Sequence, residues 1–136
     1  MLQKIILLFF AVGAAAQMPN FNGIVDEDEW HNAQRFSINY EIEPADNESA
    51  QYATEVFVTH TETDIYMGFI AFYEMKNLRT SLRSRDNIGN DDNVAVGFDP
   101  YGDGRYMIVL GANPEGSQFD FKILPNGNQD DYDLNY

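Results

Sequence analysis

From residue 18 onward, the chain alternates short apolar runs with turn-forming residues, and no helical periodicity extends beyond about two turns. This pattern is typical of an all-β domain, and a length of 136 residues favours a single one. The expected strands are Phe36–Ile42, Thr54–His60, Ile65–Tyr73, Asn93–Asp99, Arg105–Ala112 and Gln118–Ile123.

Two of these runs carry further information about burial. Ile65–Tyr73 is apolar at odd and even positions alike, which predicts a central strand covered on both faces. In Gln118–Ile123, Phe119 and Phe121 alternate with polar residues such as Asp120. This alternation predicts one face on the core and one face, with Asp120, in water.

Helices are expected to be short. Acidic residues at positions 26–29 precede Trp30 and Ala33, a pattern that predicts one or two helical turns with Trp30 as a packing anchor. Leu78 and Leu82 lie four residues apart and predict a second short helix from Lys76 to about Leu82.

The composition excludes several classes of partner and site. With 8 basic and 22 acidic residues, the net charge of −14 repels nucleic acid and anionic membrane surfaces. The absence of cysteine excludes disulfides and thiolate metal sites. The remaining oxygen-rich ligand set leaves calcium as a possible cofactor.

The first residues resemble a removable export signal. Lys4 precedes the apolar run Ile5–Val12 and a small-residue stretch that ends at Gln17, so residues 1–16 are expected to be a secretory signal peptide. The apolar run is shorter than the ~20 residues of a spanning helix. We therefore expect export to the bacterial periplasm, the outer membrane or the medium. The Asn-, Gly- and Asp-rich stretch from Pro125 to Tyr136 lacks a predicted closing strand, which suggests a chain cut short.

A polar cluster is the first candidate site. Its members are Asp86, Asn90, Asp91 and Asp92, with Asp99 and Asp103 following the next expected strand. Carboxylates and amides at this density bind calcium or sugar hydroxyls, although acidic loops of acidic proteins are often only solvated.

The stretch after Asp99 does not match a calcium-binding EF-hand loop. Asp103 and Gly104 suit such a loop, but Tyr101 stands at its third position and Leu110 at its twelfth, where a Glu is required. A hairpin turn through Pro100, Gly102 and Gly104 explains the same residues better.

A basic island and several aromatic residues are the other candidates. Lys76, Arg79, Arg83 and Arg85 hold half of the positive charge and are expected to pair with neighbours such as Glu74, Asp86 or Asp91. The alternatives are recognition of a sugar or contact with another domain. Flat aromatic rings stack on sugars, and Tyr101 at a turn tip is expected to be the most exposed of them.

Catalysis by this stretch alone is not expected. The two histidines, His31 and His60, have no motif partner, and there is no G-x-S-x-G sequence. Carboxylate pairs about 5 to 10 Å apart, as in glycosidases, are available in any acidic protein.

An ordered set of motifs resembles a known family. The segments are 22–33 (NGIVDEDEWHNA), 64–69 (DIYMGF), 85–94 (RDNIGNDDNV), 102–105 (GDGR) and 113–120 (NPEGSQFD). Together they resemble the carbohydrate-binding-module family 9-like domain of large exported bacterial proteins whose C-terminal part is a domain of unknown function thought to be a β-barrel. The resemblance spans roughly Phe21 to Asp130. Where sugar-binding members carry a tryptophan ahead of a strand, this chain has Gly89 or Asn90.

The resemblance implies an antiparallel β-sandwich at residues 17–136, incomplete at its C-terminal end, that binds polysaccharide. The expected carbohydrate-binding residues are Arg85, Asn90, Asp91, Asp92 and Tyr101. Two alternatives stay open: an interaction module that packs on a missing C-terminal domain, and part of a glycoside hydrolase that contributes acids to a shared site.

Overall fold

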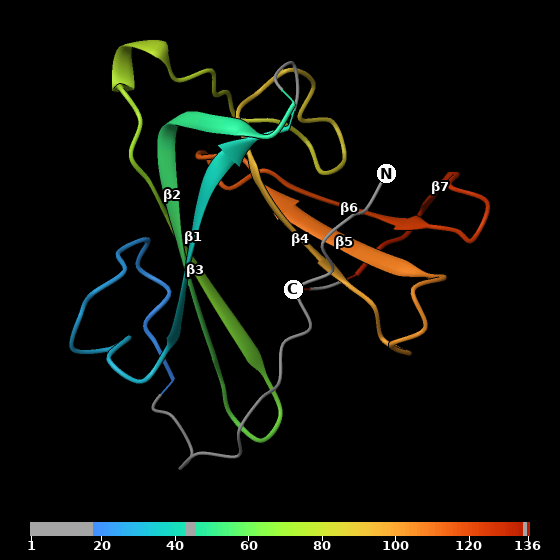
Figure 1. The fold of residues 1–136 in the computed structure, drawn as a ribbon, viewed down its shortest axis with the longest axis horizontal. Helices are drawn as coiled ribbons and strands as arrows, with labels where there is room; N and C mark the ends of the chain where they lie inside the picture. Colours follow the sequence, from blue (N-terminus) through green and yellow to red (C-terminus); the bar gives the residue numbers. More distant parts are fainter. Residues whose placement is uncertain (1–17, 43–45, 135) are drawn as a thin grey trace. The chain divides into compact units, whose positions relative to one another are not determined.

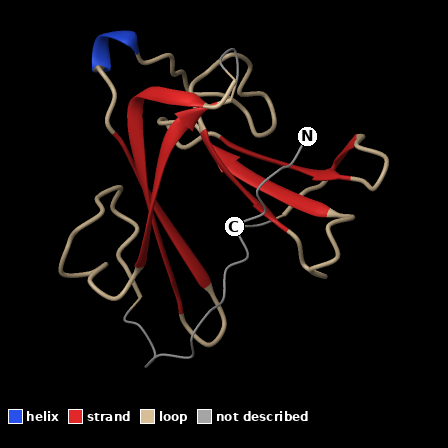
Figure 2. Ribbon diagram, viewed as in Figure 1, coloured by secondary structure: helices blue, strands red, loops and turns tan. Residues whose placement is uncertain are grey.

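A computed structural model describes residues 18–42, 46–134 and 136. The chain divides into two compact units, which meet between Phe72 and Tyr73 in the sequence. Each unit contains one antiparallel sheet, and the described residues include no α-helix (Figures 1 and 2). The prediction of an all-β chain is therefore confirmed. The expected signal peptide, at residues 1–16, lies outside the described residues.

The first unit is a sheet of three strands in the order β1-β2-β3. These strands are β1 (Gln34–Glu41), β2 (Glu48–His60) and β3 (Ile65–Ala71), and each was predicted. Phe36 pairs with Val56, which pairs in turn with Phe69. The register places these apolar side chains on one face of the sheet.

The prediction that Ile65–Tyr73 forms the central strand is wrong. Within the described part of the chain β3 pairs with β2 alone, and β2 is the central strand. The consecutive residues Val56, Phe57, Val58 and Thr59 of β2 are buried, whereas Ile65 of β3 is 50% exposed. Local apolarity therefore marked a strand correctly but did not determine its place in the sheet.

The core of the first unit lies on the opposite face of this sheet. Trp30, Phe57 and Tyr66 form it, with the Trp30 and Phe57 ring centroids 6.2 Å apart. Gly68 makes room for the indole, because a Cβ there would lie 3.2 Å from Trp30. The predicted anchoring role of Trp30 is confirmed. It sits on a turn rather than a helix, closed by a 3.0 Å bond from its N–H to the Asp26 carbonyl.

The second unit is a sheet of four strands in the order β4-β5-β6-β7. The predicted strands appear as β4 (Val94–Phe98), β5 (Met107–Ala112) and β6 (Gln118–Ile123). The short strand β7 (Gln129–Asp131) was missed. A turn from Leu124 to Asn128 joins it to β6, so the expectation of no closing strand after Pro125 is wrong.

The helix predicted from Lys76 to Leu82 is also wrong. The structure has a single 3-10 turn there, η1 (Met75–Asn77), followed by extended chain. The N–H groups of Arg79 and Ser81 donate to the carboxylates of Asp92 and Asp91. These distant acceptors replace the carbonyls that a helix would supply.

The water-facing position predicted for Asp120 is wrong as well. Its side chain is 0% exposed and is paired with Arg85. Residues from outside the sheet, such as Arg85, thus cover part of the polar face of β6. The alternation of polar and apolar residues along the strand cannot predict this cover.

Candidate functional site

The Asp91 side chain connects its own segment of the second unit to the segments of Ser81 and Asn113 by hydrogen bonds. Its Oδ2 accepts hydrogen bonds from the N–H (3.0 Å) and Oγ (2.8 Å) of Ser81 and from Nδ2 of Asn113 (3.0 Å). Arg83 Nε lies 3.7 Å away. The Ser81 hydroxyl, followed by Asn113 and Arg83, lowers the pKa of Asp91 despite its burial. Asp91 is therefore ionised at neutral pH and already engaged.

Asp92 and Arg79 bind each other through backbone and side chain. Asp92 Oδ2 accepts the Arg79 N–H, Asp92 Oδ1 accepts Arg79 Nη2, both at 2.9 Å, and the Asp92 N–H donates to the Arg79 carbonyl at 2.7 Å. The backbone hydrogen bond from Arg79 is the largest cause of the lowered pKa of Asp92. The Arg79 side chain still remains 70% exposed.

The Arg85 side chain contacts residues of β6. Its guanidinium contacts the Asp120 carboxylate, Gln118 Oε1 at 3.1 Å and Asp86 Oδ2 at 3.7 Å. Burial opposes its charge, but the hydrogen bond and charge of Asp120 outweigh that effect and raise the pKa of Arg85. Lys76 pairs with Glu74 at 2.9 Å, so the prediction of internal pairing for the basic island is confirmed.

Asn90 and Tyr101 are the expected site residues that face solvent. Asn90 is exposed in the turn before β4. Tyr101 is 77% exposed in the β4–β5 loop, with its ring centroid 6.1 Å from that of Tyr106. The predicted exposure of Tyr101 is thus confirmed.

Asp99 holds the β4–β5 loop from within. Its carboxylate accepts the N–H groups of Tyr101 (3.1 Å), Gly102 (2.8 Å) and Gly104 (2.7 Å). These bonds, that of Gly104 above all, lower the pKa of Asp99. The residues after Asp99 form the predicted hairpin between β4 and β5.

The expected site residues do not gather at one place. Arg85, Asn90, Asp91 and Asp92 precede β4, and Tyr101 follows it. The five residues of β4 rise by ~3.3 Å each, which separates its two ends by roughly 15 Å. The predicted site residues therefore lie at two locations, a hydrogen-bonded polar network at one end of β4 and an exposed aromatic loop at the other.

The buried polar residues that organise the network were not predicted from the sequence. Asn113, Ser117 and Asp120 are each 5% exposed. Asn113 Oδ1 accepts the N–H of Ser117 at 2.8 Å, and Ser117 Oγ accepts the N–H of Arg83 at 2.8 Å. The turn-forming sequence at 113–116 was the available signal, because Asn side chains commonly bind the backbone of the turns they begin.

The described ranges hold no group of three or more His, Cys, Asp or Glu side chains arranged for a metal ion. Nor does any helix in the described part of the chain have the length and apolarity to cross a membrane. No family model, curated protein or solved structure matches this chain.

Proposed function

We propose that the chain is a carbohydrate-binding module of an exported protein, a β-sandwich that holds a polysaccharide at its β4–β5 loop. The observation that carries the proposal is Tyr101, which is 77% exposed although its backbone N–H is held by the Asp99 carboxylate. An exposed, flat aromatic ring can stack on the apolar C–H face of a sugar. Export rests on the pattern of residues 1–16.

The loop also offers polar groups for sugar hydroxyls. Asp103 and Arg105 are exposed on either side of Gly104, and the Asp103 carboxylate accepts the Arg105 N–H at 3.0 Å. Carboxylate and guanidinium groups form charge-assisted hydrogen bonds with hydroxyls. Because the loop is already ordered, little conformational entropy is lost on binding.

Replacement of Tyr101 by alanine is expected to weaken binding about tenfold, the loss of one stacking contact with its buried area. Affinity gel electrophoresis across a panel of polysaccharides measures this. Tyr40→Ala is the matched control, since Tyr40 is a 58% exposed tyrosine on β1 in the other unit.

Two results would contradict the proposal. One is a folded wild-type protein that binds no glycan of a broad panel. The other is an Asp92→Ala variant that loses glycan binding at an unchanged melting temperature while Tyr101→Ala binds normally. That pattern would place the sugar at the opposite end of β4.

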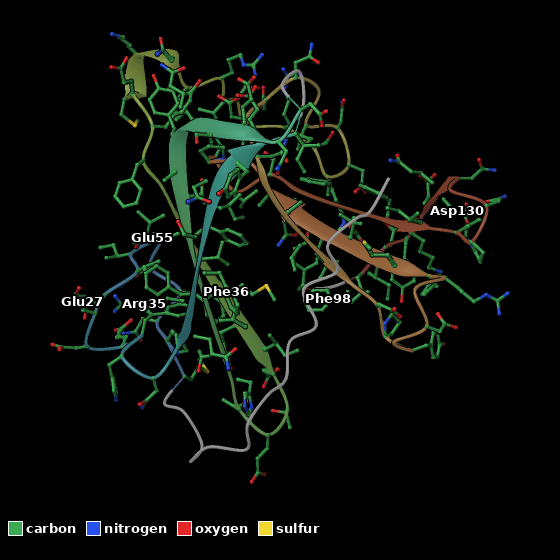
Figure 3. All side chains as sticks on the ribbon, viewed as in Figure 1. Glu27, Arg35, Phe36, Glu55, Phe98 and Asp130 are labelled. Atoms are coloured by element: carbon green, nitrogen blue, oxygen red, sulfur yellow. The ribbon has the colours of Figure 1, made fainter. Side chains whose placement is uncertain are left out.

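The sandwich rests on one apolar face in each sheet. Phe36 and Val56 lie on such a face in the first unit, and Arg35 points to the other side of β1 (Figure 3). Val109 pairs with Phe121 on a comparable face of the second unit. Stacked sheets bury faces of this kind about 10 Å apart.

A further inference from the structure

The Arg85–Asp120 pair binds both backbone polar groups of one residue, Leu134. Asp120 Oδ2 accepts the N–H of Leu134 at 2.6 Å, and Arg85 Nη2 donates to the carbonyl of the same residue. The Asp120 side chain is 0% exposed, so its charge is committed to these contacts. A buried carboxylate and a guanidinium thus hold the backbone of Leu134, which lies outside the strands of the sheet.

Tyr136 completes the contact with a side-chain hydroxyl. Its Oη lies 2.7 Å from the carbonyl oxygens of Gly111 and Phe119, and the Arg85 guanidinium lies 5.3 Å from its ring centroid. Gln118 Nε2 donates to the Tyr136 main-chain oxygen at 3.0 Å. Burial raises the pKa of the hydroxyl, which therefore remains a neutral donor.

The edge of β6 at this place does not need the segment for its own pairing. The N–H of Asp86 donates to the Gln118 carbonyl at 3.0 Å, and the N–H of Asp120 donates to Asp86 Oδ1 at 2.9 Å. Among the described residues, strand β7 pairs with Phe121, Lys122 and Ile123 of β6 and not with Gln118 or Asp120. Leu134 and Tyr136 therefore lie beside a part of β6 whose backbone groups already have partners, and side chains hold them there.

We propose that Arg85, Gln118, Asp120 and the backbone of Gly111 and Phe119 form a peptide-binding site for a segment with a tyrosine two residues after the residue whose backbone Arg85 and Asp120 bind. Leu134 and Tyr136 occupy the site in the same chain, and the same segment of a second copy can replace them. The contacts to Leu134 and to the Tyr136 main chain are independent of side-chain identity, so specificity comes from the tyrosine hydroxyl.

The full-length Leu134→Pro variant tests this site. Proline lacks the N–H that Asp120 accepts, so the attached segment is released while every receptor residue is retained. The probe is a fluorescent, capped peptide with the sequence of residues 132–136, followed by anisotropy. We expect it to bind Leu134→Pro at least about tenfold more tightly than wild type. A matched peptide that ends in phenylalanine should bind about fivefold more weakly than the tyrosine peptide.

Equal binding of the peptide to folded Leu134→Pro and wild type, or equal binding of the two peptides, would overturn the proposal. Hydrogen exchange on the wild-type chain provides a test that needs no variant. An exchangeable segment requires the Leu134 amide to exchange about 100-fold faster than the paired amides of β5 and β6. Exchange as slow as in those strands would equally reject the site.

Discussion

Replacement of Asp120 by alanine is expected to lower the free energy of unfolding of the second unit by about 3 to 5 kcal/mol, because it leaves the partly buried charge of Arg85 without its main partner. The Leu134 N–H loses its acceptor at the same time. Urea unfolding followed by far-UV circular dichroism measures the change.

Asp131→Ala is the matched control, since Asp131 is an exposed aspartate on the neighbouring strand β7, and it should change stability by less than about 0.5 kcal/mol. An Arg85→Met/Asp120→Leu double variant should recover part of the loss, because it removes both charges together. If Asp120→Ala unfolds like the wild type, the pair contributes nothing to the unit.

Phe57→Ala is expected to destabilise the first unit by about 3 to 5 kcal/mol, the usual cost of an emptied aromatic site in a core. Phe57 is 4% exposed and packs against Trp30, and the Arg35 guanidinium lies 5.1 Å from its ring centroid. Trp30 is the single tryptophan of the chain, so its fluorescence during urea unfolding reports on this unit directly.

The control for this variant is Phe21→Ala, because Phe21 is 85% exposed and touches Tyr66 from outside with ring centroids 5.8 Å apart. It should cost less than about 1 kcal/mol. A Phe57→Ala transition that coincides with that of Phe21→Ala would show that the core is not centred on Phe57.

Local patterns predicted the strands because alternation and apolar runs are properties of neighbouring residues. β4, β5 and β6 appear where the sequence placed them, within two residues, whereas β2 ends as predicted but begins at Glu48, six residues before the predicted Thr54. The order of the strands in a sheet, unlike the presence of a strand, depends on pairing between segments that are distant in the sequence. That is why the most apolar run, at β3, was assigned to the centre of a sheet in which it lies at the edge.

The errors around the candidate site share a cause. Asp120 was assigned to water from its neighbours in β6, but its partner Arg85 precedes it by 35 residues. The helix at Lys76–Leu82 was expected from local spacing, but Asp91 and Asp92 take the N–H groups of Ser81 and Arg79 from 10 and 13 residues away. Long-range polar contacts of this kind leave no periodic signal.

The way in which Asp99 holds its loop has a consequence for engineering. The Asp99 carboxylate accepts hydrogen bonds from main-chain N–H groups of the loop. The residues with a left-handed backbone conformation in this loop are Gly102 (φ 65°) and Gly104 (φ 68°). Positions 101 and 105 are therefore free to vary while the loop keeps its shape, whereas Asp103 is retained because its carboxylate accepts the Arg105 N–H. Randomised at these two positions, the hairpin becomes a small display scaffold from which ligands of new specificity can be selected.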